Sequence, residues 1–151
     1  MKSSNDLLSR IDRLESLEAL RALKAQYVVH ADRCLITPSV EHARALAELF
    51  TDDATTDYGF LGKFSGKEAI VHAFTEVLPA NSRWAAHHAL NPILSVDGDT
   101  AEGTWSFVAH SVPREPKDAA RVAYFGSYEE KYRRVGGAWK FASLIVRFSS
   151  P

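Results

Sequence analysis

Apolar residues recur at helical spacing through the first 36 residues of the chain. They are Leu7, Ile11, Leu14, Leu17, Leu20, Val28, Ala31 and Leu35, with charged residues between them. Because apolar positions three or four residues apart lie on one face of an α-helix, this pattern predicts an amphipathic helix. Asn5 or Asp6 can cap its start, and Thr37-Pro38-Ser39 ends it.

Two shorter helices are expected before residue 80. Ser39 is a candidate cap for the first, which covers 40–50. The second covers about 65–79 and is ended by its proline. Between them, the Thr-rich segment 54–58 and the glycines that follow it predict a strand or a hairpin.

The second half of the chain has the pattern of strands. The segments 83–97, 100–112, 121–135 and 138–148 are separated by turn signals, among them Asp-Gly-Asp and Gly-Gly. Helices followed by an antiparallel meander are typical of an α+β fold in which the helices close one face of a curved sheet. No repeat or linker divides the chain, so we expect one domain over 1–151.

Composition excludes several classes of protein. The 151 residues are 46% hydrophobic with a net charge of −1, so disorder is excluded and nucleic acid is not expected as a partner. The single cysteine, Cys34, forms no intrachain disulfide and suits a reducing compartment. No export signal or membrane-spanning run is present, so the sequence predicts a cytoplasmic protein without a membrane partner.

The first strand of the meander carries two adjacent histidines. On a regular strand, one face holds Trp84, Ala86, His88, Leu90, Leu94 and Val96. His88 therefore points with the apolar residues, and His87 faces solvent or the rim. A bulge at Pro92 would reverse this alternation farther along the strand.

Asp32 is the expected partner of His88. It lies one turn from Val28 and from Leu35 on the buried stripe of the first helix, so its carboxylate needs a partner at the helix–sheet interface. Asp32 would fix the tautomer of His88, which then acts as a general base. From spacing alone, a capping or surface Asp32 and a structural His88 remain alternatives.

The face on which His110 lies depends on the length of the loop between the first two strands of the meander. If residues 97–99 form a three-residue hairpin loop, His88 lies opposite Val108 and His110 is diagonally adjacent on the same face. A two-residue loop would separate the two histidines onto opposite faces. The histidines lack HxH or HExxH spacing, so no metal site and no cofactor are expected.

Arginine and tyrosine side chains complete the candidate site. Arg147 alternates with apolar residues of the last strand, so it either binds an anion inside or marks a frayed strand end. Phenol side chains can donate to a developing oxyanion or contact the substrate. The candidates are Tyr27, Tyr58, Tyr124 and Tyr128. Trp84 is a further candidate for substrate binding. Tyr27 is preferred as a catalytic group because it precedes Asp32 on the same helix.

The order of several segments resembles a known family. The segments are LKAQYVVHADRC, LFTDDATTDYG, GKEAIVHAF, HHALNPILSVDGDTAEGTW and GSYEEKYRRVGGAWKFASL. Together they resemble the SnoaL-like branch of the NTF2-like superfamily, nearest the group of scytalone dehydratase, bile acid 7α-dehydratase and hexachlorocyclohexane dehydrochlorinase. The resemblance implies a cone-like α+β barrel.

The resemblance also implies a chemistry and an assembly. By motif, Asp32 and His88 match the Asp-His dyad of this group, Tyr27 and Arg147 match the bile acid dehydratase pattern, and His110 looks like the second histidine of scytalone dehydratase. Ala31 stands where scytalone dehydratase has a tyrosine, which argues against that substrate. The implied function is a cofactor-independent lyase or dehydratase acting on a hydrophobic steroid-like or polyketide-like molecule, in a homodimer or homotrimer. An isomerase, a polyketide cyclase and a non-catalytic binder remain alternatives.

Overall fold

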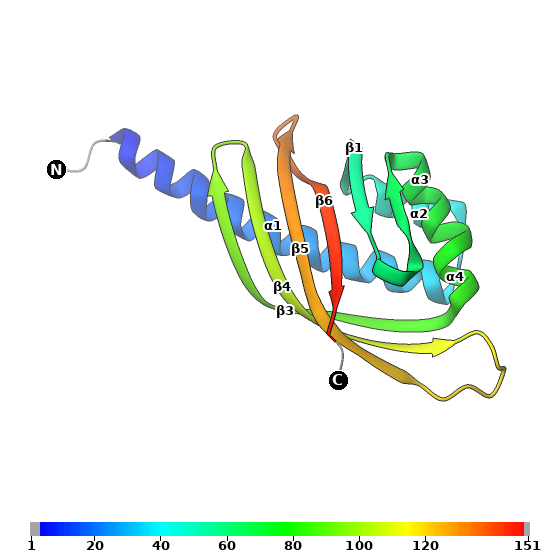
Figure 1. Cartoon of the computed structure of the whole chain (residues 1–151). Coiled ribbons are helices and arrows are strands. Elements are labelled where there is room, and N and C mark those ends of the chain that lie inside the picture. Colours follow the sequence, from blue (N-terminus) through cyan, green and yellow to red (C-terminus); the bar gives the residue numbers. More distant parts are fainter. Residues whose placement is uncertain (1–3, 150–151) are drawn as a thin grey trace.

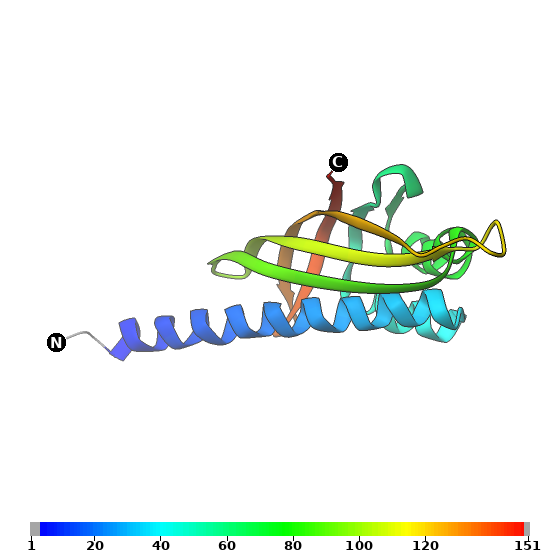
Figure 2. The ribbon, with the colours of Figure 1, turned by 90° about the horizontal axis from the view of Figure 1, so that it is seen from below.

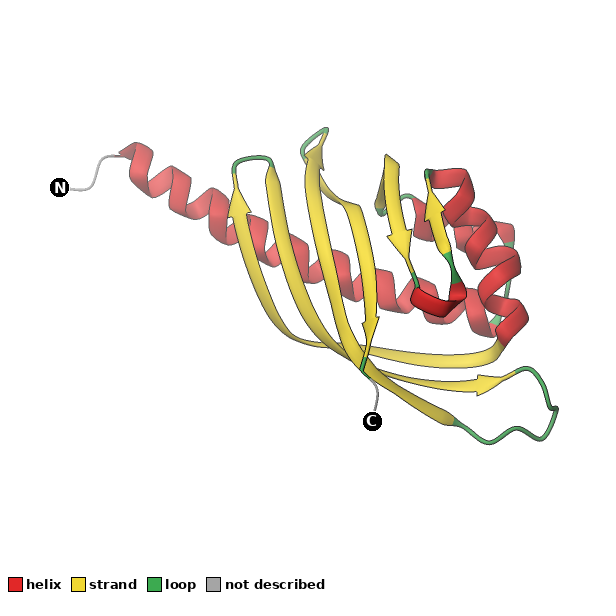
Figure 3. Ribbon diagram, viewed as in Figure 1, coloured by secondary structure: helices red, strands yellow, loops and turns green. Residues whose placement is uncertain are grey.

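The computed structural model describes residues 4–149 and contains four α-helices and six strands there. The helices are α1 (Ser4–Ile36), α2 (Val40–Ala47), α3 (Lys67–His72) and α4 (Leu78–Asn81), with the π-helical turn η2 (Ala73–Val77) between the last two. The strands are β1 (Phe50–Asp57), β2 (Lys63–Ser65), β3 (Ser82–Asp97), β4 (Thr100–Pro113), β5 (Val122–Val135) and β6 (Ala138–Phe148), and the 3-10 turn η1 (Gly59–Leu61) links β1 to β2. Figure 3 shows the helices gathered against one curved sheet.

The strands form a single mixed sheet in the order β2-β1-β6-β5-β4-β3. The pairs β3–β4, β4–β5 and β5–β6 are antiparallel, as the meander predicted, whereas β1 runs parallel to β6. The predicted α+β class with a curved, mostly antiparallel sheet is confirmed. The sheet is not a closed barrel, because β2 and β3 remain edge strands.

The second predicted helix ends earlier than its apolar pattern indicated. Phe50, placed at the end of that helix by the sequence, is instead the first residue of β1 and pairs with Phe141 of β6. Its ring packs against the rings of Phe141 and Tyr27 in the core. The third predicted helix, in contrast, runs farther than expected. It continues through Pro79 to Asn81, because a proline is tolerated in the first turn of α4.

The long helix α1 lies along the sheet beside β3 and extends beyond it at its N-terminal end (Figures 1 and 2). Its buried face begins at Ser16 and includes Leu20, Leu23 and Tyr27. The first part of the predicted apolar stripe is therefore not buried: Leu7, Ile11 and Leu14 are exposed. No helix within residues 4–149 is both long and apolar enough to span a membrane.

β-Bulges shift the face that side chains occupy at several points along the strands, including one between Ser82 and Trp84. Between Leu90 and Ile93, β3 advances three residues while β4 advances two, with Asn91 in the left-handed region at φ 51°. On β6, two residues pass between Phe141 and Ser143 while β5 advances one. Each extra residue exchanges the inner and outer faces, because side chains alternate strictly along a strand.

A buried ion pair joins α1 to β5 at the centre of the molecule. Lys24 and Glu130 pair with almost no exposure, and the Tyr132 hydroxyl also donates to Glu130. Trp105 Nε1 donates to the Tyr132 hydroxyl at 3.0 Å, and Lys24 Nζ lies 3.2 Å from the centre of the Tyr128 ring. Burial lowers the pKa of Lys24 to about 8 against the opposing effect of Glu130. The pair fixes α1 in register against the sheet.

Breaking this pair on one side is expected to be costly. In Lys24→Met, Glu130 keeps a buried charge without a cation, so the free energy of unfolding should fall by about 3–5 kcal/mol. The double variant Lys24→Met/Glu130→Gln removes that charge while keeping an acceptor for Tyr132, and should regain much of the loss. Urea unfolding followed by circular dichroism measures both.

A matched control for the Lys24 variants is the exposed ion pair between Arg44 and Glu68. Arg44→Met should cost no more than about 1 kcal/mol, because exposed pairs are screened by water. If Lys24→Met were as mild as Arg44→Met, the central role given to the buried pair would be wrong.

Candidate active site

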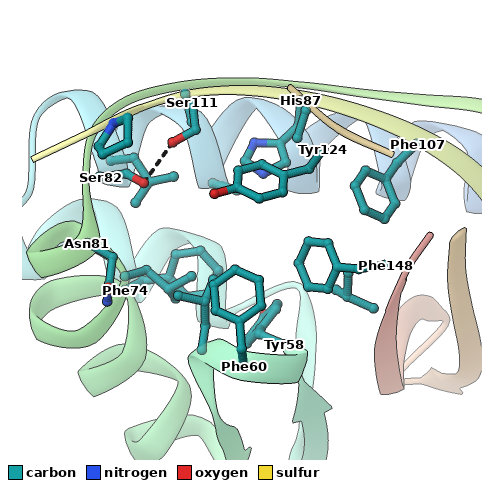
Figure 4. A pocket seen from close by; sticks show the side chains of 18 of the residues that line it. Tyr58, Phe60, Phe74, Asn81, Ser82, His87, Phe107, Ser111, Tyr124 and Phe148 are labelled. Carbon is teal, nitrogen blue, oxygen red and sulfur yellow. Dashed lines mark hydrogen bonds between the residues drawn. The ribbon is translucent and has the colours of Figure 1, made fainter. Parts of the chain in front are cut away.

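An internal cavity of about 320 Å³ opens between the sheet and the helices. Its walls come from α1, the η1 turn, the segment from η2 to α4, and the inner faces of β3 to β6. Figure 4 shows aromatic rings around most of this space, including Phe74, Phe107 and Phe148. A mostly apolar cavity with few polar groups is typical of a small-molecule site.

One carboxylate and one imidazole meet at the wall of this cavity. The Nδ1 atom of His87 lies 2.6 Å from Oδ1 of Asp32, and each side chain is only about one-fifth exposed, 22% and 23%. The backbone N–H of His87 also donates to the same carboxylate, at 3.1 Å and 3.2 Å to its two oxygens. Asp32 therefore holds both the ring and the backbone of His87.

The contact arises where α1 runs along the free edge of the sheet. Because β3 pairs only with β4, some N–H groups on its other side need partners. Asp32, from the last third of α1, supplies an acceptor for one of them. Among the described residues, His87 lines the cavity and Asp32 does not. The carboxylate therefore lies on the side of the His87 ring that faces away from the cavity.

This geometry defines what the imidazole can do. A carboxylate that accepts from Nδ1–H favours the neutral tautomer in which Nε2 carries a lone pair. Figure 4 shows the His87 ring directed into the cavity beside Tyr124. The arrangement can therefore take a proton from a bound molecule and stabilise the imidazolium that forms.

Three of the four phenols that line this space are buried, and burial favours their neutral form. Burial raises the pKa values of Tyr27, Tyr58 and Tyr128 above the usual range, and nearby groups raise those of Tyr27 and Tyr128 further. Tyr27 donates to the Tyr58 hydroxyl over a long 3.4 Å. Protonated phenols in an apolar wall are suited to donate hydrogen bonds to an oxygen that gains negative charge.

The structure does not bring Asp32 and His88 together, so the predicted pairing was wrong. His88 is exposed and points to the outer face of the sheet, while His87 points inward. The bulge at Asn91 and Pro92 explains the error: Leu94 and Val96 face the core beyond the bulge, but just before it the inner face belongs to odd-numbered residues such as Ala85 and His87. The predicted alternation assigned one face to the even-numbered residues from Trp84 to Val96, although the bulge exchanges the two faces between them.

His110 does not face the cavity either. The β3–β4 turn has two residues, Gly98 and Asp99, yet the bulge adds one residue to β3 and returns His88 to the position opposite Val108. His88 and His110 therefore do share a face, as the three-residue loop would have required. That face is the outer one, and both histidines lie outside the set of described residues that line the cavity.

Arg147 is also turned outward. Its Nε and Nη2 atoms donate to Glu129 at 3.3 Å each, and its side chain is about half exposed. The bulge on β6 places Leu144 and Val146 on the inner face, so Arg147 falls on the other one. The expected inward arginine was thus wrong for the same reason as the inward His88.

The aromatic candidates divide in the same way. Tyr27, Tyr58, Tyr124 and Tyr128 all line the cavity. Trp84, which was expected to contact substrate, is only partly buried and does not belong to the described lining, because it shares the outer face of β3 with His88. Within residues 4–149, no three side chains of His, Cys, Asp or Glu gather as a metal site would require.

Sequence reasoning missed the residue that Asp32 contacts and four polar residues of the wall, which are Asn81, Ser82, Ser111 and Glu115. The bulge expected at Pro92 is present, and His87 could have been found by counting back through it from the core residues Leu94 and Val96. Ser82 and Ser111, whose hydroxyls lie 2.8 Å apart in the cavity wall, carry no sequence signal of their own.

Several solved structures share this fold. The hexachlorocyclohexane dehydrochlorinase LinA-type3 from Novosphingobium barchaimii is 22% identical, with a TM-score of 0.80, and the match covers 93% of this chain and 91% of that one. A scytalone dehydratase candidate from Novosphingobium aromaticivorans is 23% identical, with a TM-score of 0.77 over 91% of this chain and 87% of that one. An NTF2-like protein with a cystatin-like fold from the same species is 24% identical, with a TM-score of 0.77 over 98% and 91%.

The sequence itself points to one family. A comparison with curated proteins finds no match. The model of the SnoaL-like domain matches residues 12–145, which span α1 to β6 and include every wall of the cavity except the C-terminal end of β6. With the NTF2-like fold seen in the structural neighbours, this match means that the chain belongs to the SnoaL-like family.

Proposed function

We propose that the protein is a cofactor-independent lyase of the dehydratase type, in which His87 takes a proton from a hydrophobic cyclic substrate. The observation that carries this proposal is the 2.6 Å contact between Asp32 and His87 Nδ1 at the wall of an apolar cavity. The fold similarity to a dehydrochlorinase and to a scytalone dehydratase candidate supports an elimination.

The proposed reaction assigns a role to each group. His87 Nε2 removes a proton from the carbon next to a carbonyl, and the electron pair of that C–H bond becomes the enolate and then the new C=C bond. As the C–O bond to the leaving hydroxyl breaks, the imidazolium returns its proton, so water departs. Asp32 orients His87 and stabilises its charged form, while Tyr58 and Tyr128 offer hydrogen bonds to the enolate oxygen and Tyr27 supports Tyr58 by donating to its hydroxyl.

The proton-removal step can be tested without the natural substrate. The probe is 2-decalone, an apolar bicyclic ketone, and NMR in D₂O follows the exchange of the protons beside its carbonyl. The wild-type protein should accelerate this exchange over buffer. The variant His87→Gln should lose about 10²- to 10⁴-fold of the acceleration, the usual contribution of a positioned base.

The neighbouring histidine supplies a matched control. His88→Gln makes the same chemical change one residue away, on the outer face, and should leave the exchange rate unchanged. Equal rates for His87→Gln and the wild type would remove His87 as the base and favour a non-catalytic binding protein. With 4-hydroxy-2-decalone, formation of the conjugated enone identifies elimination, whereas exchange without enone would favour an isomerase.

Self-association is part of the same proposal. The outer face of the sheet carries Leu90, Ile93 and Phe125, with Ile93 76% exposed. Apolar side chains gathered on one sheet face are typical of a surface that a second copy covers. The charge-introducing variant Ile93→Asp/Phe125→Asp should convert a dimer or trimer to a monomer in light scattering, and a wild-type protein that is already a monomer would refute this part.

A further inference from the structure

The cavity has a second polar group at a distance from His87. The hydroxyls of Ser82 on β3 and Ser111 on β4 lie 2.8 Å apart in its wall. Figure 4 shows this pair at the end of the cavity opposite Phe107 and Phe148, with Asn81 beside it. Neither serine takes part in the reaction proposed for His87.

The serine pair leaves hydrogen-bonding capacity directed to the cavity. One hydroxyl donates to the other, so the second still has its own proton, and no protein acceptor for that proton is found within residues 4–149. Ser111 is only 7% exposed and Ser82 is partly buried, so a molecule or water bound in the cavity is the natural acceptor for the remaining proton of the pair. The pair therefore offers one donor and free lone pairs to a ligand.

Asn81 adds an acceptor at the same end. Its side chain is exposed at the rim, and its Nδ2 donates to the Val77 carbonyl at 2.8 Å, so the amide oxygen can accept from a ligand or from water. Arg114 holds the backbone here, because its Nε donates to the Pro79 carbonyl at 2.8 Å and its Nη2 to the Ser82 carbonyl at 3.4 Å. The polar end is thus fixed between α4, β3 and the end of β4.

The charges at this end do not favour an anionic ligand group, because Arg114 already donates to the Pro79 and Ser82 carbonyls. Among the described residues that line the cavity there is no lysine or arginine, and Glu115 stands at the polar end. A carboxylate or phosphate of a ligand would meet that acid without a cation in the wall. A ligand hydroxyl, which both donates and accepts, satisfies the serine pair and Asn81 without introducing charge.

The strand register sets the spacing between the two polar groups. Ala109 lies opposite His87, and Ser111 lies opposite Ala85, two residues farther along β4. Two residues of a strand span about 7 Å, so the backbone positions that carry the two polar groups are about that far apart. Two fused six-membered rings bridge such a distance.

From these observations we infer that Ser82, Ser111 and Asn81 form a binding subsite for a neutral hydroxyl group at the far end of a fused-ring ligand. The inference rests on the proposed function only in placing the ketone end of that ligand at His87. The protein should select uncharged, hydroxylated polycyclic molecules and reject their carboxylate analogues.

Binding measurements test the subsite directly. Isothermal titration calorimetry compares 2-decalone, 6-hydroxy-2-decalone and 6-carboxy-2-decalone on the full-length protein. The hydroxyl should tighten binding about two- to tenfold relative to 2-decalone, which is the usual value of one neutral hydrogen bond, and the carboxylate should weaken it. Ser111→Ala and Ser82→Ala should each remove the gain from the hydroxyl and leave the affinity for 2-decalone unchanged.

Ser106→Ala is the matched control, because Ser106 lies on the same strand with its side chain exposed on the outer face. It should keep the full preference for the hydroxylated ligand, and thermal unfolding should show all three alanine variants folded. The subsite is refuted if the wild type does not prefer the hydroxyl, if Ser111→Ala weakens both neutral ligands equally, if the carboxylate binds tightest, or if no decalone binds.

The titrations are repeated in the His87→Gln background. There the proton-transfer chemistry is absent but the serine pair is intact, so the preference for the hydroxyl should persist. A failure of the proposed reaction would appear in the exchange rates alone, whereas a failure of the subsite would appear in these affinities.

Discussion

The hydrogen bonds from His87 to the carboxylate of Asp32 connect the fold of this protein to its chemistry. They join the long helix α1 to the free edge of the sheet, and the same carboxylate accepts from both the backbone and the ring of one residue. A ring held at Nδ1 and open at Nε2 is a prepared proton acceptor. Without this contact the apolar cavity would have no oriented imidazole in its wall.

The rest of the structure keeps that contact in place. Farther back along α1, Lys24 pairs with Glu130 and lies over the Tyr128 ring, so the helix is fixed against β5 as well as β3. Tyr128 in turn forms part of the cavity wall. The helix that supplies Asp32 is therefore anchored at two points, one charged and fully buried, the other partly exposed and directed to the cavity.

Most of the architecture could be predicted from the sequence, whereas the orientation of single side chains could not. Periodicity located α1 and all four strands of the meander to within a few residues. Asp32 was placed correctly at the helix–sheet interface because helical phase accumulates without interruption. His88 and Arg147 were placed on the wrong faces because each lies on a strand with a bulge, and one extra residue exchanges the faces. Bulges depend on cross-strand pairing, which one strand's pattern does not contain.

The most direct test is the tautomer of His87, measured by ¹⁵N NMR of the histidine side chains. In the neutral wild-type protein, His87 should be protonated at Nδ1 and unprotonated at Nε2, and Asp32→Asn should weaken that preference. The exposed ring of His88 serves as the internal reference in the same spectrum. A neutral His87 protonated at Nε2, or one with the same tautomer mixture as His88, would contradict an imidazole prepared by Asp32 to accept a proton.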